Sequence, residues 1–99
     1  MAMPERLSDA AIAEALRDLP QWRRSDDGLS IERRYDFDDF VQAFGFMAQM
    51  ALVSETMNHH PEWSNVYRHV TVRMSTHDAG GLTALDVQWA RRADAVSGR

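Results

Sequence analysis

The feature that most constrains the fold is a long, apolar-rich stretch, DFDDFVQAFGFMAQMALVSETMNHHP (residues 36–61). Its apolar side chains recur at the three- and four-residue spacing of an amphipathic helix. Pro61 restricts the residue before it to an extended conformation and so ends the helix. Asp36 and Asp39 are expected to cap the start. The segment is therefore predicted to be the long central helix. Its expected buried residues are Phe40, Ala43, Phe44, Met47, Met50, Ala51 and Met57.

The segments before this helix predict one shorter helix and a hairpin. In residues 7–20, Ser8 is placed to cap a helix with an apolar stripe. In residues 23–37, the turn signal Asp27-Gly28 is followed by alternating apolar and polar side chains. This pattern is typical of two antiparallel strands joined by a tight turn.

The segments after the central helix predict further strand and a last helix. Residues 62–77 alternate between apolar and polar side chains, which indicates a strand region, as one strand or as two with a bend. Thr83 and Asp86 then have the spacing of a capping pair. The order helix, strand, strand, helix, strand region, helix favours an α+β fold in which helices cover one face of an antiparallel sheet.

Composition limits the classes of function. A chain of 99 residues suits one domain with one core, spanning residues 1–99. The net charge of −4 gives no positive field for a nucleic acid, and no apolar run is long enough to cross a membrane. Cysteine is absent from the sequence, which removes thiolate chemistry and fits a reducing compartment. We therefore expect a soluble cytoplasmic protein, whose small sheet with an exposed edge invites pairing with a second subunit.

Histidines carry most of the chemistry that this sequence offers. His59 and His60 are adjacent at the end of the central helix, and His77 follows the strand region. Histidine titrates near neutrality, so two imidazoles at one ligand can accept and donate protons in the same turnover. Glu55 lies four residues before His59, a helical spacing that lets its carboxylate orient that imidazole. An antiparallel layout permits the three imidazoles to converge.

Other readings of these residues remain open. A histidine near a helix end can simply satisfy the helix dipole, and His69, on the polar face of a strand, is expected to be only solvated. The three histidines with Glu55 could also hold zinc or iron. However, side chains at His59 and His60 diverge by roughly 100° on a regular helix, which disfavours a metal site. By spacing alone, Asp86 is explained by helix capping.

A longer pattern across these residues resembles a known family. The run ETMNHHPEWSNVYRHVTVRMSTHDAGGLTALD (residues 55–86) is similar to the signature of the pterin-4a-carbinolamine dehydratases, also known as dimerisation cofactors of a hepatocyte transcription factor. The preceding helical segment resembles the central helix of that family. The matching positions are Glu55, His59, His60, Pro61, Tyr67, His77 and Asp86.

The resemblance implies a fold, a reaction and a set of site residues. The implied fold is a four-stranded antiparallel sheet with three helices on one face, assembled into homodimers or homotetramers. The implied reaction is dehydration of a 4a-hydroxytetrahydropterin to the quinonoid dihydropterin during recycling of the pterin for aromatic amino acid hydroxylases. The pterin is the substrate, and no separate cofactor or metal is expected. The implied catalytic residues are His60, His77 and His59. The implied substrate-binding residues are His59, Glu55, Trp63 and Asp86.

The resemblance implies His60 and His77 as acid and base, in an order that the sequence leaves open, with His59 orienting the pterin. Glu55 would support the histidines, and Trp63 would line the ring pocket. A role as a protein-binding module, which the same family includes, is an alternative. In that case a protein partner, which the sequence does not identify, would contact an exposed helix face.

Overall fold

The computed structural model describes residues 4–99 of the chain. Three α-helices, four strands and one short 3-10 turn follow one another, beginning and ending with a helix. In chain order the elements are α1 (Asp9–Leu16), β1 (Arg23–Arg24), β2 (Ile31–Asp36), α2 (Phe40–Met57), β3 (Glu62–Val66), β4 (His69–Met74), η1 (His77–Ala79) and α3 (Ala84–Ser97).

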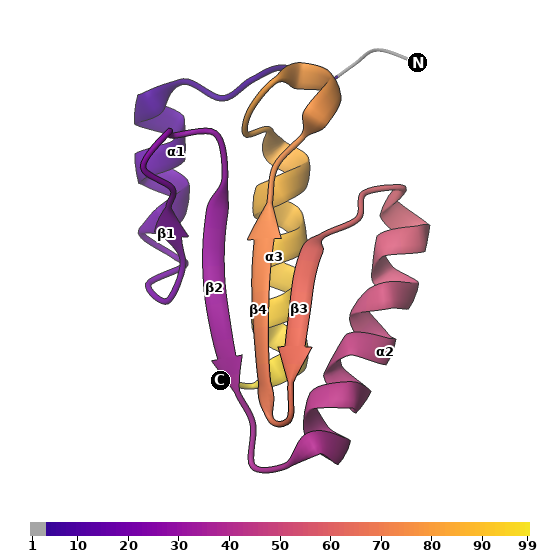
Figure 1. Cartoon of the computed structure of the whole chain (residues 1–99). Helices are drawn as coiled ribbons and strands as arrows, with labels where there is room; N and C mark the ends of the chain where they lie inside the picture. Colours follow the sequence, from indigo (N-terminus) through magenta and orange to yellow (C-terminus); the bar gives the residue numbers. More distant parts are fainter. Residues whose placement is uncertain (1–3) are drawn as a thin grey trace.

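The strands form one antiparallel sheet in the order β1-β2-β4-β3, which leaves β3 at an edge. Figure 1 shows α3 passing behind the central strands, with α1 and α2 to either side. Side chains of β4 alternate between buried and exposed, because one face of the sheet is covered by helices and the other is open. The predicted α+β fold with a four-stranded sheet and three helices is confirmed.

Local signals place the helix starts. The Ser8 hydroxyl accepts a hydrogen bond from the backbone of α1, and Thr83 and Asp86 form a complete capping box at α3, as predicted. At α2 the prediction of a capping pair was half wrong. Asp39 is the N-cap and accepts from the backbone N–H of Gln42. The carboxylate of Asp36 instead turns to the open face of the sheet.

The buried face of α2 agrees only in part with the predicted one. Ala43 and Met50 pack into the core as predicted, and Met47 and Met57 pack against it. Phe46 is buried although it was not predicted to be, whereas Phe40, Phe44 and Ala51 are exposed. The stretch carries apolar side chains on more than one side, so spacing alone does not identify the face that the sheet covers. Trp89 of α3 is fully buried in the core. The fully buried core side chains also include Tyr35, Met50, Val70, Val72 and Met74.

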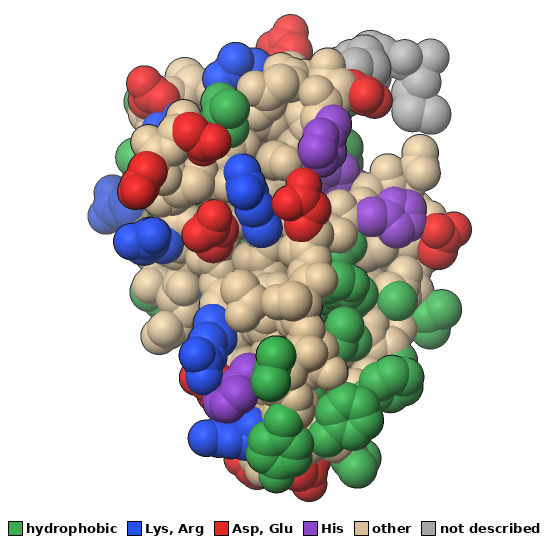
Figure 2. All heavy atoms as spheres, in the orientation of Figure 1, with side chains coloured by type: hydrophobic (Ala, Val, Ile, Leu, Met, Phe, Trp, Pro, Cys, Tyr) green, Lys and Arg blue, Asp and Glu red, His purple; other side chains and the backbone are tan. Residues whose placement is uncertain are grey.

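An apolar surface remains uncovered along α2 and the β3–β4 turn. Figure 2 shows these side chains gathered at the lower right of the molecule. The apolar surface consists of Phe40, Val41, Phe44 and Leu52 of α2 together with Val66 and Tyr67. Even so, within residues 4–99 no helix combines the length and apolarity needed to cross a membrane.

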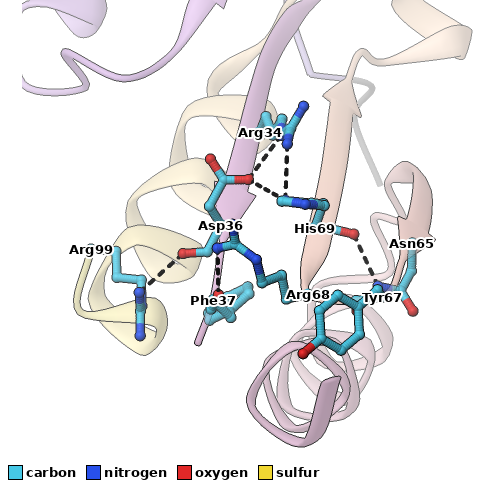
Figure 3. A network of polar contacts seen from close by, with 8 residues as sticks. All are labelled: Arg34, Asp36, Phe37, Asn65, Tyr67, Arg68, His69 and Arg99. Atoms are coloured by element: carbon cyan, nitrogen blue, oxygen red, sulfur yellow. Dashed lines mark hydrogen bonds and ion pairs between the residues drawn. The ribbon is translucent and has the colours of Figure 1, made fainter. Parts of the chain in front are cut away.

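A network of polar contacts joins β2 and β4 near this turn, as Figure 3 shows. His69 Nδ1 lies 2.5 Å from Asp36 Oδ1, and the Arg34 side chain contacts both residues. His69 is therefore held in a network, and the expectation that it is only solvated was wrong. The hydrogen bonds from Arg34 and then from His69 lower the pKa of the Asp36 carboxyl below its ordinary value.

Candidate functional site

The end of α2 sends the two adjacent histidines in different directions. Asn58 adopts the left-handed conformation, with φ 50° and ψ 43°, and caps the helix with its backbone N–H. Asparagine tolerates this conformation better than most residues. His59 and His60 therefore lie beyond the helix, just before Pro61. The spacing of four between Glu55 and His59 no longer places them on one helical face.

His59 points inward, to a buried carboxylate at the start of α3. Its Nε2 lies 2.6 Å from Asp86 Oδ1, and the two side chains are 9% and 0% exposed. Asp86 Oδ2 accepts hydrogen bonds from the Thr76 hydroxyl and from the backbone N–H of Thr83, at 2.8 and 2.9 Å. The Thr76 and Thr83 hydroxyl oxygens are 2.8 Å apart. His59 is thus anchored by a buried chain of hydrogen bonds.

The other two histidines of the predicted site are exposed, and each has a surface carboxylate as partner. His60 Nε2 lies 2.8 Å from Glu55 Oε1, and its side chain is 53% exposed. His77, in η1, has its Nε2 3.3 Å from Glu62 Oε1 and is 80% exposed. In both residues the contact engages one ring nitrogen, and Nδ1 remains for a ligand.

All three histidines line one cavity of about 240 Å³ between the end of α2 and the start of η1. Figure 2 shows histidine side chains gathered at the upper right of the molecule, away from the apolar surface. The residues that line the cavity are Asn58, His59, His60, Ser75, Thr76, His77 and Asp78. A second hollow, of about 210 Å³, continues from Ser75, Thr76 and His77 toward Glu62 and Arg73. The structure thus brings together the imidazoles that the sequence places in two separate segments.

Three other predicted site residues lie away from the cavity lining. Glu55 contacts His60 rather than His59, because the helix ends before His59. The Trp63 ring packs against Trp89, with 6.1 Å between ring centroids, and borders a separate hollow of about 340 Å³ on the sheet. Asp86 was expected to bind substrate, but its carboxylate is fully buried behind His59. A ligand in the cavity therefore meets His59 before it could meet Asp86.

Sequence reasoning missed Thr76, whose hydroxyl bonds to Asp86 and whose side chain borders the cavity. Its place directly before His77 was the only available signal. That position does not reveal that the hydroxyl points to the start of α3.

The donor geometry bears on the alternative of a metal site. Across residues 4–99, no three side chains among His, Asp and Glu come together as a group that could hold a metal ion. His59, His60 and His77 line the same cavity, yet each turns a ring nitrogen to a different carboxylate. Each imidazole is therefore held separately, by a carboxylate of its own.

The chain matches known proteins over nearly its whole length. A family model described as pterin 4 alpha carbinolamine dehydratase matches residues 5–96. A protein from Bradyrhizobium sp. (strain ORS 278) that is named a pterin-4-alpha-carbinolamine dehydratase is 54% identical over 95 residues, covering 96% of this chain and 95% of that protein. A protein of the same name from Afipia carboxidovorans is 48% identical over 97 residues, covering 98% and 97%.

Solved structures share the fold. A crystal structure of a transcriptional coactivator/pterin dehydratase from Brucella melitensis aligns with a TM-score of 0.93 at 46% identity, covering 95% of this chain and 100% of that one. A pterin dehydratase-like protein, identified as a RuBisCO assembly factor in the alpha-carboxysome, aligns with a TM-score of 0.68 at 23% identity. It covers 79% of this chain and 90% of that one, and this likeness concerns the fold alone.

Proposed function

Since the chain belongs to the pterin 4 alpha carbinolamine dehydratase family, we propose that it removes water from a 4a-hydroxytetrahydropterin and releases the quinonoid dihydropterin. The observation that carries this proposal is the cavity in which His59, His60 and His77 meet. In the cell, the reaction would return oxidised pterin toward the tetrahydropterin used in aromatic amino acid hydroxylation.

The proposed reaction needs two proton transfers. The bond between C4a and its hydroxyl oxygen breaks, and the oxygen leaves with the electron pair and an added proton as water. The adjacent ring nitrogen loses its proton, and its electrons form the new double bond to C4a. An acid and a base at one ring therefore suffice, and such assistance typically supplies about 10²–10⁴-fold in rate.

In this proposal His60 and His77 are the acid and the base, because both are exposed at the cavity and each keeps Nδ1 for the pterin. Either histidine could take either role. Glu55 and Glu62 hold the opposite ring nitrogens and so orient the two imidazoles. His59, fixed by Asp86, binds and orients the pterin ring.

Stopped-flow measurement of freshly generated 4a-hydroxypterin tests the assignment. His60→Ala and His77→Ala are each expected to lose most of the dehydration rate, while the circular dichroism spectrum and unfolding midpoint stay close to those of the wild type. His69→Ala is the matched control, since His69 lies in the network at the opposite end of β4 and should keep the wild-type rate. Near-normal rates in both His60 and His77 variants would remove the proposed mechanism.

We also propose that the chain self-associates through the apolar surface and the edge strand β3. Six large apolar side chains are exposed there, and β3 carries unpaired backbone groups along its outer side. A second copy would cover both at once, because the β3–β4 turn contributes to the surface. The expected assembly is a dimer, or a tetramer if the strand edge and the helix face pair with different copies.

Light scattering coupled to size-exclusion chromatography tests self-association. Phe44→Glu places a charge in the apolar surface and should shift the assembly toward monomer. Ala13→Glu, on the exposed side of α1, adds the same charge elsewhere and should leave the mass unchanged. A wild-type chain that runs as a monomer across the micromolar range would contradict the proposal.

A further inference from the structure

The structure assigns a positioning role to Thr76: through Asp86, its hydroxyl holds His59 in the tautomer that presents an unprotonated Nδ1 to the cavity. This inference rests on the proposed function only for its kinetic consequence. The sequence pattern does not reveal this contribution of Thr76; the direction of the hydrogen bonds behind His59 does.

The chain of hydrogen bonds can run in only one direction. A carboxylate accepts hydrogen bonds and does not donate them, so the Thr76 hydroxyl donates its single hydrogen to Asp86 Oδ2. Thr83 must then donate its own hydrogen to the Thr76 oxygen, 2.8 Å away. The Thr83 oxygen in turn accepts from the backbone N–H of Leu85. Each hydroxyl is therefore used once as donor and once as acceptor.

The hydrogen bonds to Asp86 also determine which ring nitrogen of His59 carries the hydrogen. Asp86 Oδ2 is occupied by Thr76 and by the backbone N–H of Thr83, which leaves Oδ1 for the imidazole. Asp86 stands in the first turn of α3, where the helix dipole favours a negative charge. Oδ1 therefore acts as acceptor at 2.6 Å, and His59 Nε2 carries the hydrogen. In a neutral imidazole this leaves Nδ1 as the acceptor.

His59 Nδ1 remains accessible from the cavity. Within residues 4–99, the His59 side chain bonds through Nε2, and Nδ1 is not among the buried side-chain atoms without a partner, which are Ser30 Oγ and Arg33 Nε. Nδ1 is therefore not sealed in the core. The His59 side chain also borders the cavity while nearly all of it is buried. Its small exposed part is thus the part that a pterin ring would meet.

The Thr76 hydroxyl matters because Asp86 could otherwise rotate. Without it, Oδ2 keeps only the hydrogen bond from the Thr83 backbone, and the carboxylate gains freedom about its terminal torsion. The contact at Oδ1 then loosens, and His59 can exchange between its two tautomers. The expected consequence is a lower turnover rate with little change in the fold.

The test compares Thr76→Val, which removes the hydroxyl at constant shape, with Thr76→Ser, which keeps it. Thr71→Val, at an exposed position of β4 five residues before Thr76, is the matched control. We expect Thr76→Val to lower kcat by roughly tenfold with a smaller change in KM, which is the lower end of the loss typical of an outer hydrogen-bond partner at a metal-bound histidine. Thr76→Ser should restore most of the rate, and Thr71→Val should not change it.

Long-range ¹H–¹⁵N spectra of the histidine rings supply a readout that a purely structural role would not move. Wild-type His59 should be in the Nε2–H form, and Thr76→Val should shift it toward a mixture. An Nδ1–H form in the wild type would overturn the inference without any variant. An unchanged tautomer in a folded Thr76→Val protein would overturn it as well. The spectra need no turnover, so absence of dehydratase activity in the wild type would count against the proposed function alone.

Discussion

The protein holds two histidine–aspartate pairs, one beside the cavity and one across the β2–β4 ladder, and their contact distances are nearly equal. His59 Nε2 is 2.6 Å from Asp86 Oδ1, and His69 Nδ1 is 2.5 Å from Asp36 Oδ1. Their surroundings differ. The side chains of the first pair are 9% and 0% exposed, whereas those of the second are 27% and 52% exposed.

The difference shows that distance alone does not give such a pair its function. Asp86 is buried and binds His59, the Thr76 hydroxyl and the backbone N–H of Thr83. Loss of its carboxylate would therefore leave several buried groups without a hydrogen-bond partner. Asp36 contacts Arg34 and His69 at the surface, where water screens these interactions. The buried pair holds one ring in one orientation beside a cavity, while the exposed pair ties two neighbouring strands together.

The largest expected effect is on stability at the buried pair. Asp86→Ala should lower the free energy of unfolding by about 3 kcal/mol or more, because a buried partner of His59, Thr76 and the Thr83 backbone is removed. Asp36→Ala should cost at most about 1 kcal/mol. Urea denaturation at pH 7 measures both values. Equal costs would show that burial does not separate the two pairs.

The second prediction concerns rate. His59→Gln removes the imidazole that faces the proposed substrate and should lower kcat by about 10²-fold. His69→Gln, which makes the same change in the exposed pair, should leave kcat unchanged. Stopped-flow dehydration assays on both variants measure the contrast. A comparable loss in His69→Gln would mean that the exposed network also takes part in turnover.

Local signals in the sequence were sufficient for much of the fold. The caps at Ser8 and at Thr83 depend only on residues within one turn, so spacing predicts them. The buried face of α2 was harder to predict from the sequence. Phe44 and Phe46 are both apolar, and only packing against the sheet decides which of them is covered. Fold class depends on the order of the elements, which survives such an error.

The sequence indicated that the three histidines could meet, but not which groups they contact or which other residues line the cavity. Adjacent histidines before Pro61 indicated a ligand cavity, and the structure places both there with His77. The partner of Glu55 was predicted incorrectly, since helical spacing stops at Asn58. Thr76 lies ten residues before Asp86, and their contact depends on how the loop after β4 returns to α3. Local sequence patterns do not predict the course of that loop.

A third prediction uses the backbone beside each pair. Asn58, next to His59, and Tyr67, two residues before His69, have φ of 50° and 51°. Left-handed backbone costs a bulky residue roughly 1–2 kcal/mol but is tolerated by asparagine. After allowing for the greater freedom of the unfolded chain, Tyr67→Gly should raise the free energy of unfolding by about 0.5 kcal/mol, and Asn58→Gly should leave it nearly unchanged. Denaturation at low protein concentration, to limit self-association, tests this order; a clear gain at Asn58 would reverse it.

The smallest expected effect is the pH dependence of the exposed pair. The hydrogen bonds from Arg34 and His69 lower the pKa of Asp36 in the folded protein below its unfolded value of 3.8. The ionised carboxylate therefore contributes stability that is fully present above the unfolded pKa. That contribution is lost as the pH falls through the lower, folded pKa.

Asp36→Asn should accordingly lower the free energy of unfolding slightly at pH 7, and the difference from the wild type should shrink below about pH 4. The effect is small because water screens a half-exposed pair. Asp26→Asn, an exposed carboxylate in the β1–β2 loop, is the control for the change in net charge. Urea denaturation at pH 7 and at pH 3 measures how far the free energy of unfolding of each variant differs from that of the wild type. If the cost of Asp36→Asn is the same at both pH values, the charge of Asp36 does not stabilise the network, and the contacts to Arg34 and His69 hold equally well with a neutral amide.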